Sequence, residues 1–263
     1  MLLADKVAVV VGGGQTPGET IGNGRATAIQ FAREGARVVV ADRDLGSAQE
    51  TVAMIQAEGG AAEAIMADVT DESSVSAMIQ HCVEARGGID VLHNNVGMSL
   101  AGGDAPVEEI TTEAFDHLVQ VNLRSMVLTA KHALPHMRAA GGGVTLNVSS
   151  MAARLAYPYV AYKTTKAAVI ALTEQLAQRN AKFGIRANVI LPGLINTPMA
   201  VEARITDEKP RAAVIAERNA NVPLGRKMGT AWDVAHAAAF LASDRVGFIT
   251  GVALPVDGGA SVS

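Results

Sequence analysis

Tyr162 and Lys166 are the two side chains of this sequence whose types and spacing most clearly allow joint chemistry. They lie in the stretch Tyr159-Val-Ala-Tyr-Lys-Thr-Thr-Lys166, and a spacing of four puts both on one face of a helix. A phenol has an unperturbed pKa of about 10, so acid/base work near neutral pH requires stabilisation of its anion by about 4 kcal/mol. An ammonium at ~4 Å in an effective dielectric of ~20 supplies an energy of that size. The pair therefore predicts proton transfer by Tyr162.

Such a pair also arises by chance, so its neighbours must support the prediction. Asn147-Val-Ser-Ser150 closes the apolar run that begins at Gly143, and Asn94-Asn-Val-Gly97 closes the run that begins at Ile89. Asn122 stands within a long helical pattern, in Val-Asn-Leu. Sites of α/β proteins form where strands end. We therefore expect these polar residues to gather near Tyr162.

A glycine-rich turn follows the first apolar run, Val7 to Val11. Gly12 closes that run, and Gly22-Asn23-Gly24 opens a helical pattern. Glycines allow the backbone to approach a pyrophosphate, and a helix N-terminus offers free N–H groups to it. Asp42 ends the next apolar run, where a carboxylate accepts both ribose hydroxyls of NAD and repels the extra phosphate of NADP. The sequence therefore favours NAD, although Arg43 could meet that phosphate and leaves NADP as the alternative.

Six motifs in this order resemble the short-chain dehydrogenase/reductase family. They are the glycine turn, Asn-Asn-Val-Gly, Val-Asn-Leu, Asn-Val-Ser-Ser, Tyr-x-x-x-Lys and Pro192-Gly-Leu-Ile-Asn-Thr-Pro198, and the resemblance runs from about Lys6 to Gly259. It implies an oxidoreductase that transfers a hydride between a nicotinamide cofactor and a secondary alcohol or ketone.

The resemblance also implies roles for individual residues. Tyr162 is the general acid/base, and Ser150 holds the reacting oxygen. Lys166 lowers the pKa of the tyrosine and binds the nicotinamide ribose, while Asn122 orders a water chain that reaches the lysine. The implied cofactor-binding residues are Gly12, Gly22, Asn23, Gly24, Asp42, Arg43, Asp68, Val69, Asn95, Gly97, Tyr162, Lys166, Pro192, Gly193, Ile195 and Thr197.

Several alternatives stay open. Ser149, rather than Ser150, has the family's usual distance to Tyr162. Tyr159 lies seven residues before Lys166, the spacing of the enoyl-reductase branch. A catalytically silent, nucleotide-sensing protein could use the same fold. The first turn carries about six extra residues, and we expect this segment, 15–21, to project as a surface loop beside the adenosine and pyrophosphate.

Short apolar runs alternate with helical patterns along the whole chain. The runs are Val7 to Val11, Arg37 to Ala41, Ala61 to Ala67, Ile89 to His93, Gly143 to Val148, Ile185 to Leu191 and Val252 to Val256. This alternation predicts one α/β domain, residues 1–263, with a Rossmann-type, doubly wound parallel sheet of about seven strands and helices on both faces. His93 fills a strand position and is expected in the core.

The substrate pocket is expected to be largely apolar. Its candidate residues are Met98, Ser99, Leu100, Arg154, Leu155, Tyr157, Tyr159, Leu194 and Met199. A substrate loop over about 194–226 is expected to close over the site. The charges from Glu202 to Arg218 are interpreted as solvated, and Arg154 as a surface residue.

Composition excludes several kinds of partner. The 263 residues carry 22 basic and 26 acidic side chains, a net charge of -4, which predicts no nucleic-acid or membrane partner. The start of the chain lacks the pattern of a signal peptide, so we expect a cytoplasmic protein.

Cys82 is the only cysteine, and His132 and His136 lack a third ligand, so no metal site is expected. Apolar helix surfaces around 114–139 and 161–183 predict a homotetramer.

Overall fold

Seven apolar segments pair side by side into one sheet, in the order β3-β2-β1-β4-β5-β6-β7, and all pairs are parallel. The computed structural model describes residues 1–263. The strands are β1 (Val7–Val11), β2 (Arg37–Asp42), β3 (Ala61–Met66), β4 (Val91–Asn94), β5 (Gly143–Val148), β6 (Ile185–Pro192) and β7 (Ala253–Val256). Every strand lies within two residues of the run expected from the sequence. The prediction of a doubly wound parallel sheet is confirmed.

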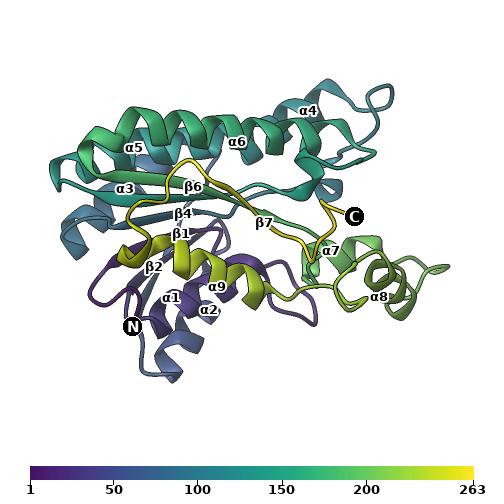
Figure 1. Ribbon diagram of the computed structural model, residues 1–263, viewed down its shortest axis with the longest axis horizontal. Coiled ribbons are helices and arrows are strands. Elements are labelled where there is room, and N and C mark those ends of the chain that lie inside the picture. The colour runs from purple at the N-terminus through teal and green to yellow at the C-terminus, as the bar shows by residue number, and fades with distance from the viewer.

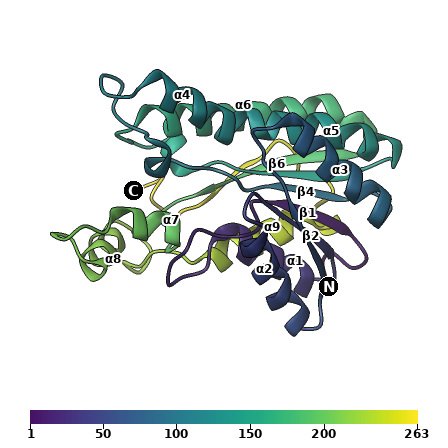
Figure 2. The same cartoon turned by 180° about the vertical axis from the view of Figure 1, so that it is seen from behind.

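Helices cover both faces of this sheet (Figures 1 and 2). One face carries α1 (Asn23–Arg33), α2 (Leu45–Ala57) and α9 (Ala231–Ala242). The opposite face carries α3 (Glu72–Arg86), α4 (Thr112–Val119), α5 (Ser125–Ala139) and α6 (Val160–Asn180). No helix is long and apolar enough to cross a membrane.

Two apolar cores fill the space between the sheet and these helices. Val10 and Val91 face the first layer, where they join Phe31 of α1. Val9 and Leu92 point the other way, because successive side chains of a strand alternate between the faces. A parallel sheet is buried on both faces, which explains why its strands are continuous apolar runs.

Three helices begin at a side chain that caps them. Asp44, Asp71 and Thr111 accept hydrogen bonds from first-turn N–H groups of α2, α3 and α4, which satisfies donors that no helical partner reaches. The N-cap residue of α6 is Tyr159, and its side chain makes no such bond. The first turn of α6 must therefore be satisfied by another part of the chain.

The segment between β6 and α9 projects beyond the carboxyl ends of the strands (Figure 1). It contains α7 (Pro198–Val201), the 3-10 turn η5 (Glu202–Arg204) and α8 (Arg211–Ala220). Val201, Val214, Val222 and Met228 form a small apolar cluster of its own. The sequence predicts a substrate loop over about 194–226, so we refer to these elements as the substrate segment.

The lengthened glycine turn contacts this segment, which the sequence did not predict. Arg211 Nη1 lies 3.0 Å from Glu19 Oε2, and a Cβ atom on Gly18 would lie only 2.7 Å from Pro198. The turn therefore lies between the first strand and the substrate segment. It is exposed, as expected, but it packs against α7 rather than standing free.

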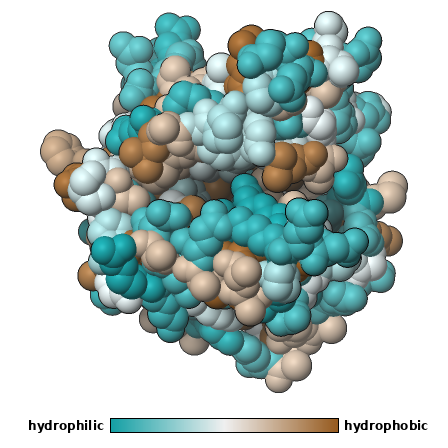
Figure 3. Space-filling view, turned by 90° about the vertical axis from the view of Figure 1, so that its right-hand side faces the viewer, coloured by the Kyte–Doolittle hydropathy of each residue, from teal (hydrophilic) through white to brown (hydrophobic).

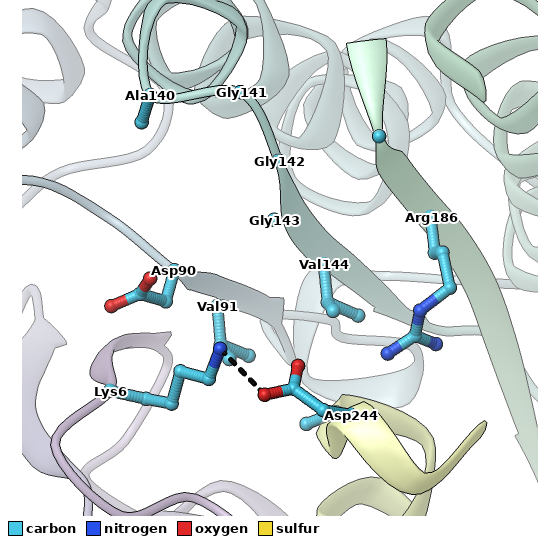
Figure 4. A pocket seen from close by; sticks show the side chains of 12 residues that line it. Lys6, Asp90, Val91, Ala140, Gly141, Gly142, Gly143, Val144, Arg186 and Asp244 are labelled. Atoms are coloured by element: carbon cyan, nitrogen blue, oxygen red, sulfur yellow. Dashed lines mark ion pairs between the residues drawn. The ribbon is translucent and has the colours of Figure 1, made fainter. Parts of the chain in front are cut away.

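The two ends of the sheet differ in character. At the carboxyl end the surface is hollowed between the upper and lower halves of the molecule (Figure 3). At the amino end lies a cavity of about 300 Å³ (Figure 4). There Lys6 Nζ lies 3.0 Å from Asp244 Oδ2, Asp90 accepts the N–H of Val7, and Arg186 donates to backbone carbonyls. The charged side chains of this cavity already have partners within the protein. We therefore interpret the cavity as a structural feature and not as a binding site.

Candidate active site

The first turns of α6 bring Tyr162 and Lys166 together, as the sequence predicts. Lys166 Nζ lies 5.7 Å from the centre of the Tyr162 ring and donates a hydrogen bond to the carbonyl of Val148 at 2.9 Å. Val148 is the last residue of β5, so the lysine links the helix to the carboxyl end of the sheet. Only 2% of the Lys166 surface is exposed.

The pKa shift of Tyr162 differs from our expectation. Burial raises the pKa of Tyr162 to about 12, and its hydrogen bond with Ser150 acts in the opposite direction. Burial also lowers the pKa of Lys166 to about 8. The expected net lowering of the phenol's pKa is therefore not found, because burial outweighs the groups that favour the phenolate. Tyr162 keeps its proton at neutral pH.

The two serines at the end of β5 have different environments. Ser149 is buried, and its hydroxyl donates to the backbone carbonyl of Lys166 at 2.6 Å. The Ser150 hydroxyl accepts the N–H of Ala152 and lowers the pKa of Tyr162. The hydroxyl that faces the phenol is that of Ser150, the serine that the motifs favour.

Asn122 lies on a turn of π-helix, η2 (Gln120–Arg124), between α4 and α5. Its side chain accepts the N–H of Met98 at 2.8 Å and donates to the carbonyl of the same residue at 2.9 Å. A Cβ atom on Gly97 would lie 2.8 Å from Lys166 Nζ. Asn122 thus fixes the chain that follows β4 and brings Gly97 close to the ammonium of Lys166.

The glycine turn forms a cradle at the point where β1 lies between β2 and β4. Gly12 has φ +82°, a left-handed conformation that favours glycine. A Cβ atom on Gly24 would lie 1.8 Å from the Gly12 carbonyl oxygen, and Asn95 Nδ2 donates to that oxygen at 3.0 Å. Dinucleotides bind at such switch points in the strand order.

Asp42 lies beside this cradle at the end of β2. Its Oδ2 accepts the N–H of Gly14 at 3.0 Å, and its Oδ1 accepts the N–H of Asp44 at 3.1 Å. Arg43 is exposed. The carboxylate, and not the guanidinium, is therefore held against the glycine turn.

Three unsatisfied polar atoms support a dinucleotide along the carboxyl end of the sheet. Thr20 Oγ1, Asn23 Oδ1 and Asn196 Oδ1 are buried without a hydrogen-bond partner. They come from the lengthened turn, the start of α1 and the segment after β6. Buried polar atoms are normally paired, because leaving them unpaired costs about 1–3 kcal/mol each. The residues present fit a cofactor that supplies the missing partners.

The remaining predicted cofactor residues divide into two groups. Residues 192–197 lie at and after the carboxyl end of β6, with Thr197 buried and Ile195 paired to Gly229 in a short parallel bridge. Val69 is buried after β3, whereas Asp68 is exposed and accepts the N–H of Thr70. Asp68 and Val69 thus lie at the edge of the sheet, away from Tyr162.

Asp104 is a buried residue of the site that the sequence did not reveal. Its Oδ1 accepts the N–H of Ala161 at 2.9 Å, and its Oδ2 accepts the N–H of Tyr162 at 3.0 Å. The neighbouring Ala105 carbonyl accepts the N–H of Val160. This loop therefore caps the first turn of α6 from 57 and 58 residues away in sequence, a separation that no local motif marks.

Tyr157 packs against Tyr162 and is linked to Asp104 through Ser99. Its ring centre lies 5.5 Å from that of Tyr162, and its hydroxyl lies 3.0 Å from Ser99 Oγ, which donates to Asp104 Oδ2. Arg154 is exposed, as expected.

The interpretation of the charges from Glu202 to Arg218 as solvated is wrong for Arg218. Burial lowers the pKa of this guanidinium to about 10, with a further lowering by the charge of Arg204.

Known proteins resemble the chain over nearly its whole length. A family model described as enoyl-(acyl carrier protein) reductase matches residues 19–261. The 2,5-dichloro-2,5-cyclohexadiene-1,4-diol dehydrogenase LinX of Sphingobium indicum is 38% identical, over 99% of this chain and 98% of that protein. The 7alpha-hydroxysteroid dehydrogenase of Clostridium sardiniense is 36% identical, over 98% of this chain and 94% of that protein.

A solved structure extends the likeness to three dimensions. A short-chain dehydrogenase/reductase from Burkholderia xenovorans superposes with a TM-score of 0.91 at 35% identity, covering 99% of this chain and 98% of the other. Fold, motif order and relatives agree. The chain therefore belongs to the short-chain dehydrogenase/reductase family and is an oxidoreductase that transfers a hydride between a nicotinamide cofactor and a secondary alcohol or ketone.

Proposed function

We propose that the protein is an NAD-dependent alcohol dehydrogenase and ketoreductase in which Tyr162 is the general acid/base. The observation that carries this proposal is the convergence of Tyr162, Ser150 and Lys166 at the carboxyl end of the sheet, beside the glycine cradle. The nicotinamide, when bound, supplies or accepts the hydride.

The side chains of the site move and stabilise the proton. With a pKa of about 12, Tyr162 holds its proton at neutral pH, so it can give that proton to a carbonyl oxygen in reduction, and the phenolate can take one from a hydroxyl in oxidation. Ser150 hydrogen-bonds the same oxygen. Lys166, with a pKa of about 8, is mostly charged at neutral pH, and its charge favours the phenolate that reduction leaves behind.

The choice of NAD rests on Asp42. Its carboxylate is fixed by two backbone N–H groups beside the glycine turn, where it would accept ribose hydroxyls and repel a 2′-phosphate. We further propose that the protein is a homotetramer. The cytoplasmic location remains a prediction from the sequence.

The proposal is tested by two matched tyrosine variants. Tyr162→Phe removes the proton donor but leaves the ring, so we expect kcat to fall by about three orders of magnitude or more. Binding of NADH, measured by fluorescence titration, should remain. Tyr159→Phe, the matched control at the start of α6, should retain most of its activity.

The reverse result identifies the second candidate function. Loss of activity in Tyr159→Phe alone would assign the reaction to the enoyl-reductase class, which the description of the matching family model favours. A panel of secondary alcohols and ketones, followed by nicotinamide absorbance, provides the substrates for both measurements.

A further inference from the structure

The three tyrosines of the chain form one aromatic cluster around the reacting phenol. The ring centre of Tyr157 lies 5.5 Å from that of Tyr162 and 5.5 Å from that of Tyr159. The planes of these two ring pairs are inclined at 44° and 87°. Tyr157 is only partly buried, so some of its surface stays accessible beside Tyr162. A substrate bound at Tyr162 is therefore in a position to contact Tyr157.

The hydroxyl of Tyr157 belongs to a chain of hydrogen bonds that ends at a buried carboxylate. Tyr157 Oη lies 3.0 Å from Ser99 Oγ, and Ser99 Oγ donates to Asp104 Oδ2 at 3.0 Å. The two oxygens of Asp104 also accept the N–H groups of Ala161 and Tyr162. Ser99 and Asp104 are each only 5% exposed. Tyr157 is thus the member of this chain that a substrate can reach.

The carboxylate fixes the direction in which the protons of this chain point. An ionised carboxylate only accepts hydrogen bonds, and a serine hydroxyl has one proton to give. Ser99 donates that proton to Asp104, so in the contact between Ser99 and Tyr157 the phenol must be the donor. The oxygen of Tyr157 is then left with a free lone pair and without a proton for any further partner.

We propose that Tyr157 determines substrate specificity by accepting a hydrogen bond from a second hydroxyl group of the substrate. A carbonyl, ether or carboxylate oxygen at the same place has no proton to donate, so it would stay unpaired, which is unfavourable. The aromatic cluster offers apolar ring faces against which a cyclic substrate can pack. This inference rests on the proposed function and adds a substrate class to it, the cyclic diols and hydroxyketones.

The test measures binding separately from turnover. Protein saturated with NADH is titrated by calorimetry with cyclohexane-1,2-diol, -1,3-diol and -1,4-diol, since an alcohol and NADH cannot react. Each diol is compared with the fluorocyclohexanol in which fluorine replaces one hydroxyl, because fluorine is close to a hydroxyl in size but has no proton to donate. We expect the wild type to bind at least one diol about 3-fold to 10-fold more tightly than its fluorinated partner.

Two variants test the donor and acceptor roles. Tyr157→Phe keeps the ring but removes the oxygen, so it should abolish the preference for the diol. Ser99→Ala removes the group to which the phenol donates, so the proton of Tyr157 becomes free for the substrate. Protein saturated with NAD⁺ is therefore also titrated with the methoxycyclohexanone substituted at the preferred position and with its ethyl analogue, since a ketone and NAD⁺ cannot react. The wild type should not prefer the ether, whereas Ser99→Ala should prefer it about 3-fold to 10-fold.

Thr164→Val is the matched control, because it removes an exposed hydroxyl of the same helix that donates to the Val160 carbonyl. It should keep the preference for the diol, and an equal loss in this variant would overturn the proposal. Equal affinity for diol and fluoroalcohol in all three pairs, including no binding of either, would also overturn it. So would an unchanged preference in Tyr157→Phe, or a wild type that prefers the ether.

These failures differ from a failure of the proposed function. Oxidation of simple secondary alcohols through Tyr162 does not depend on a second hydroxyl, so it would persist if Tyr157 had no part in specificity. Protein that binds no NADH would contradict the proposed cofactor, and the same titrations with NADPH and NADP⁺ then test Tyr157.

Discussion

Asp42 is the residue on which cofactor choice is predicted to depend. Asp42→Ser removes the carboxylate but keeps a small hydrogen-bonding group beside Gly14. We expect kcat/KM to fall for NADH and to rise for NADPH, each by about ten-fold or more, because an acceptor of the ribose hydroxyls and a repulsive charge are lost together. Steady-state rates with both cofactors measure this. A wild type that already prefers NADPH would instead make Arg43 the determining residue.

His93 is predicted to make the protein sensitive to acid. It is fully buried on β4, neither ring nitrogen has a partner, and burial lowers its pKa to about 3. The unfolded chain takes up a proton near pH 6.5 while the folded chain does not, so the stabilisation present above pH 6.5 is lost as the pH falls toward 3. From pH 7 to pH 5 the loss is about 2 kcal/mol.

The measurement is urea unfolding at pH 7 and pH 5. His93→Leu should lose about 2 kcal/mol less than the wild type over this interval, since the apolar side chain does not titrate. His117→Gln, which removes an exposed histidine, should behave like the wild type. An unchanged acid sensitivity in His93→Leu would show that other groups dominate.

Residue identities were more predictable than residue charges. The helical spacing was enough to place Tyr162 beside Lys166, and the motifs were enough to favour Ser150. The direction of the tyrosine's pKa shift was not predictable, because it depends on how deeply the folded chain buries the phenol. Arg218 shows the same limit, because the local sequence of a charged helix does not indicate which of its side chains the fold will bury.

At the scale of elements, the position of α6 is predicted to depend on Asp104. Asp104→Ala removes the acceptor of two first-turn N–H groups, one of them that of Tyr162 itself. We expect the free energy of unfolding to fall by about 1–2 kcal/mol and kcat to fall by about ten-fold or more, because a small displacement of the phenol is costly.

A comparison with another helix separates positioning from stability. Thr111→Ala removes the cap of α4, so it should lower stability by about 1 kcal/mol and leave kcat nearly unchanged. If both variants lose the same fraction of kcat, Asp104 acts only through overall stability. A change in the pH dependence of kcat in Asp104→Ala alone would support its role in placing Tyr162.

Strands were the most predictable elements, because each is an apolar run that stays buried on both faces. Local sequence did not reveal the π-helical turn that carries Asn122, since it depends on contacts with Met98 and Thr165 in other parts of the chain. The contact between the lengthened glycine turn and α7 was also missed. Its polar, glycine-containing sequence indicates only a surface loop.

At the scale of the whole molecule, several apolar side chains are left on the surface. Phe248 is fully exposed between α9 and β7, and Phe240 of α9 is 47% exposed. Phe248 precedes β7 in the chain, and α9 packs beside it. β7 is the last strand of the sheet, and its outer edge has no partner strand. Val127 of α5 is 43% exposed on the other helical layer. An unpaired sheet edge and exposed aromatic side chains are surfaces that a partner subunit can cover.

We therefore predict a tetramer with two different two-fold contacts, one at β7 with Phe248 and one along α5 with Val127. Light scattering should give four chains of 27.1 kDa each, or about 108 kDa. A buried charge in one contact should break that contact alone, so Phe248→Glu and Val127→Glu should each give dimers, and the double variant should give folded monomers. A wild-type mass near 27 kDa at working concentration would refute the assembly. A tetramer that survives both substitutions would place its contacts on other surfaces.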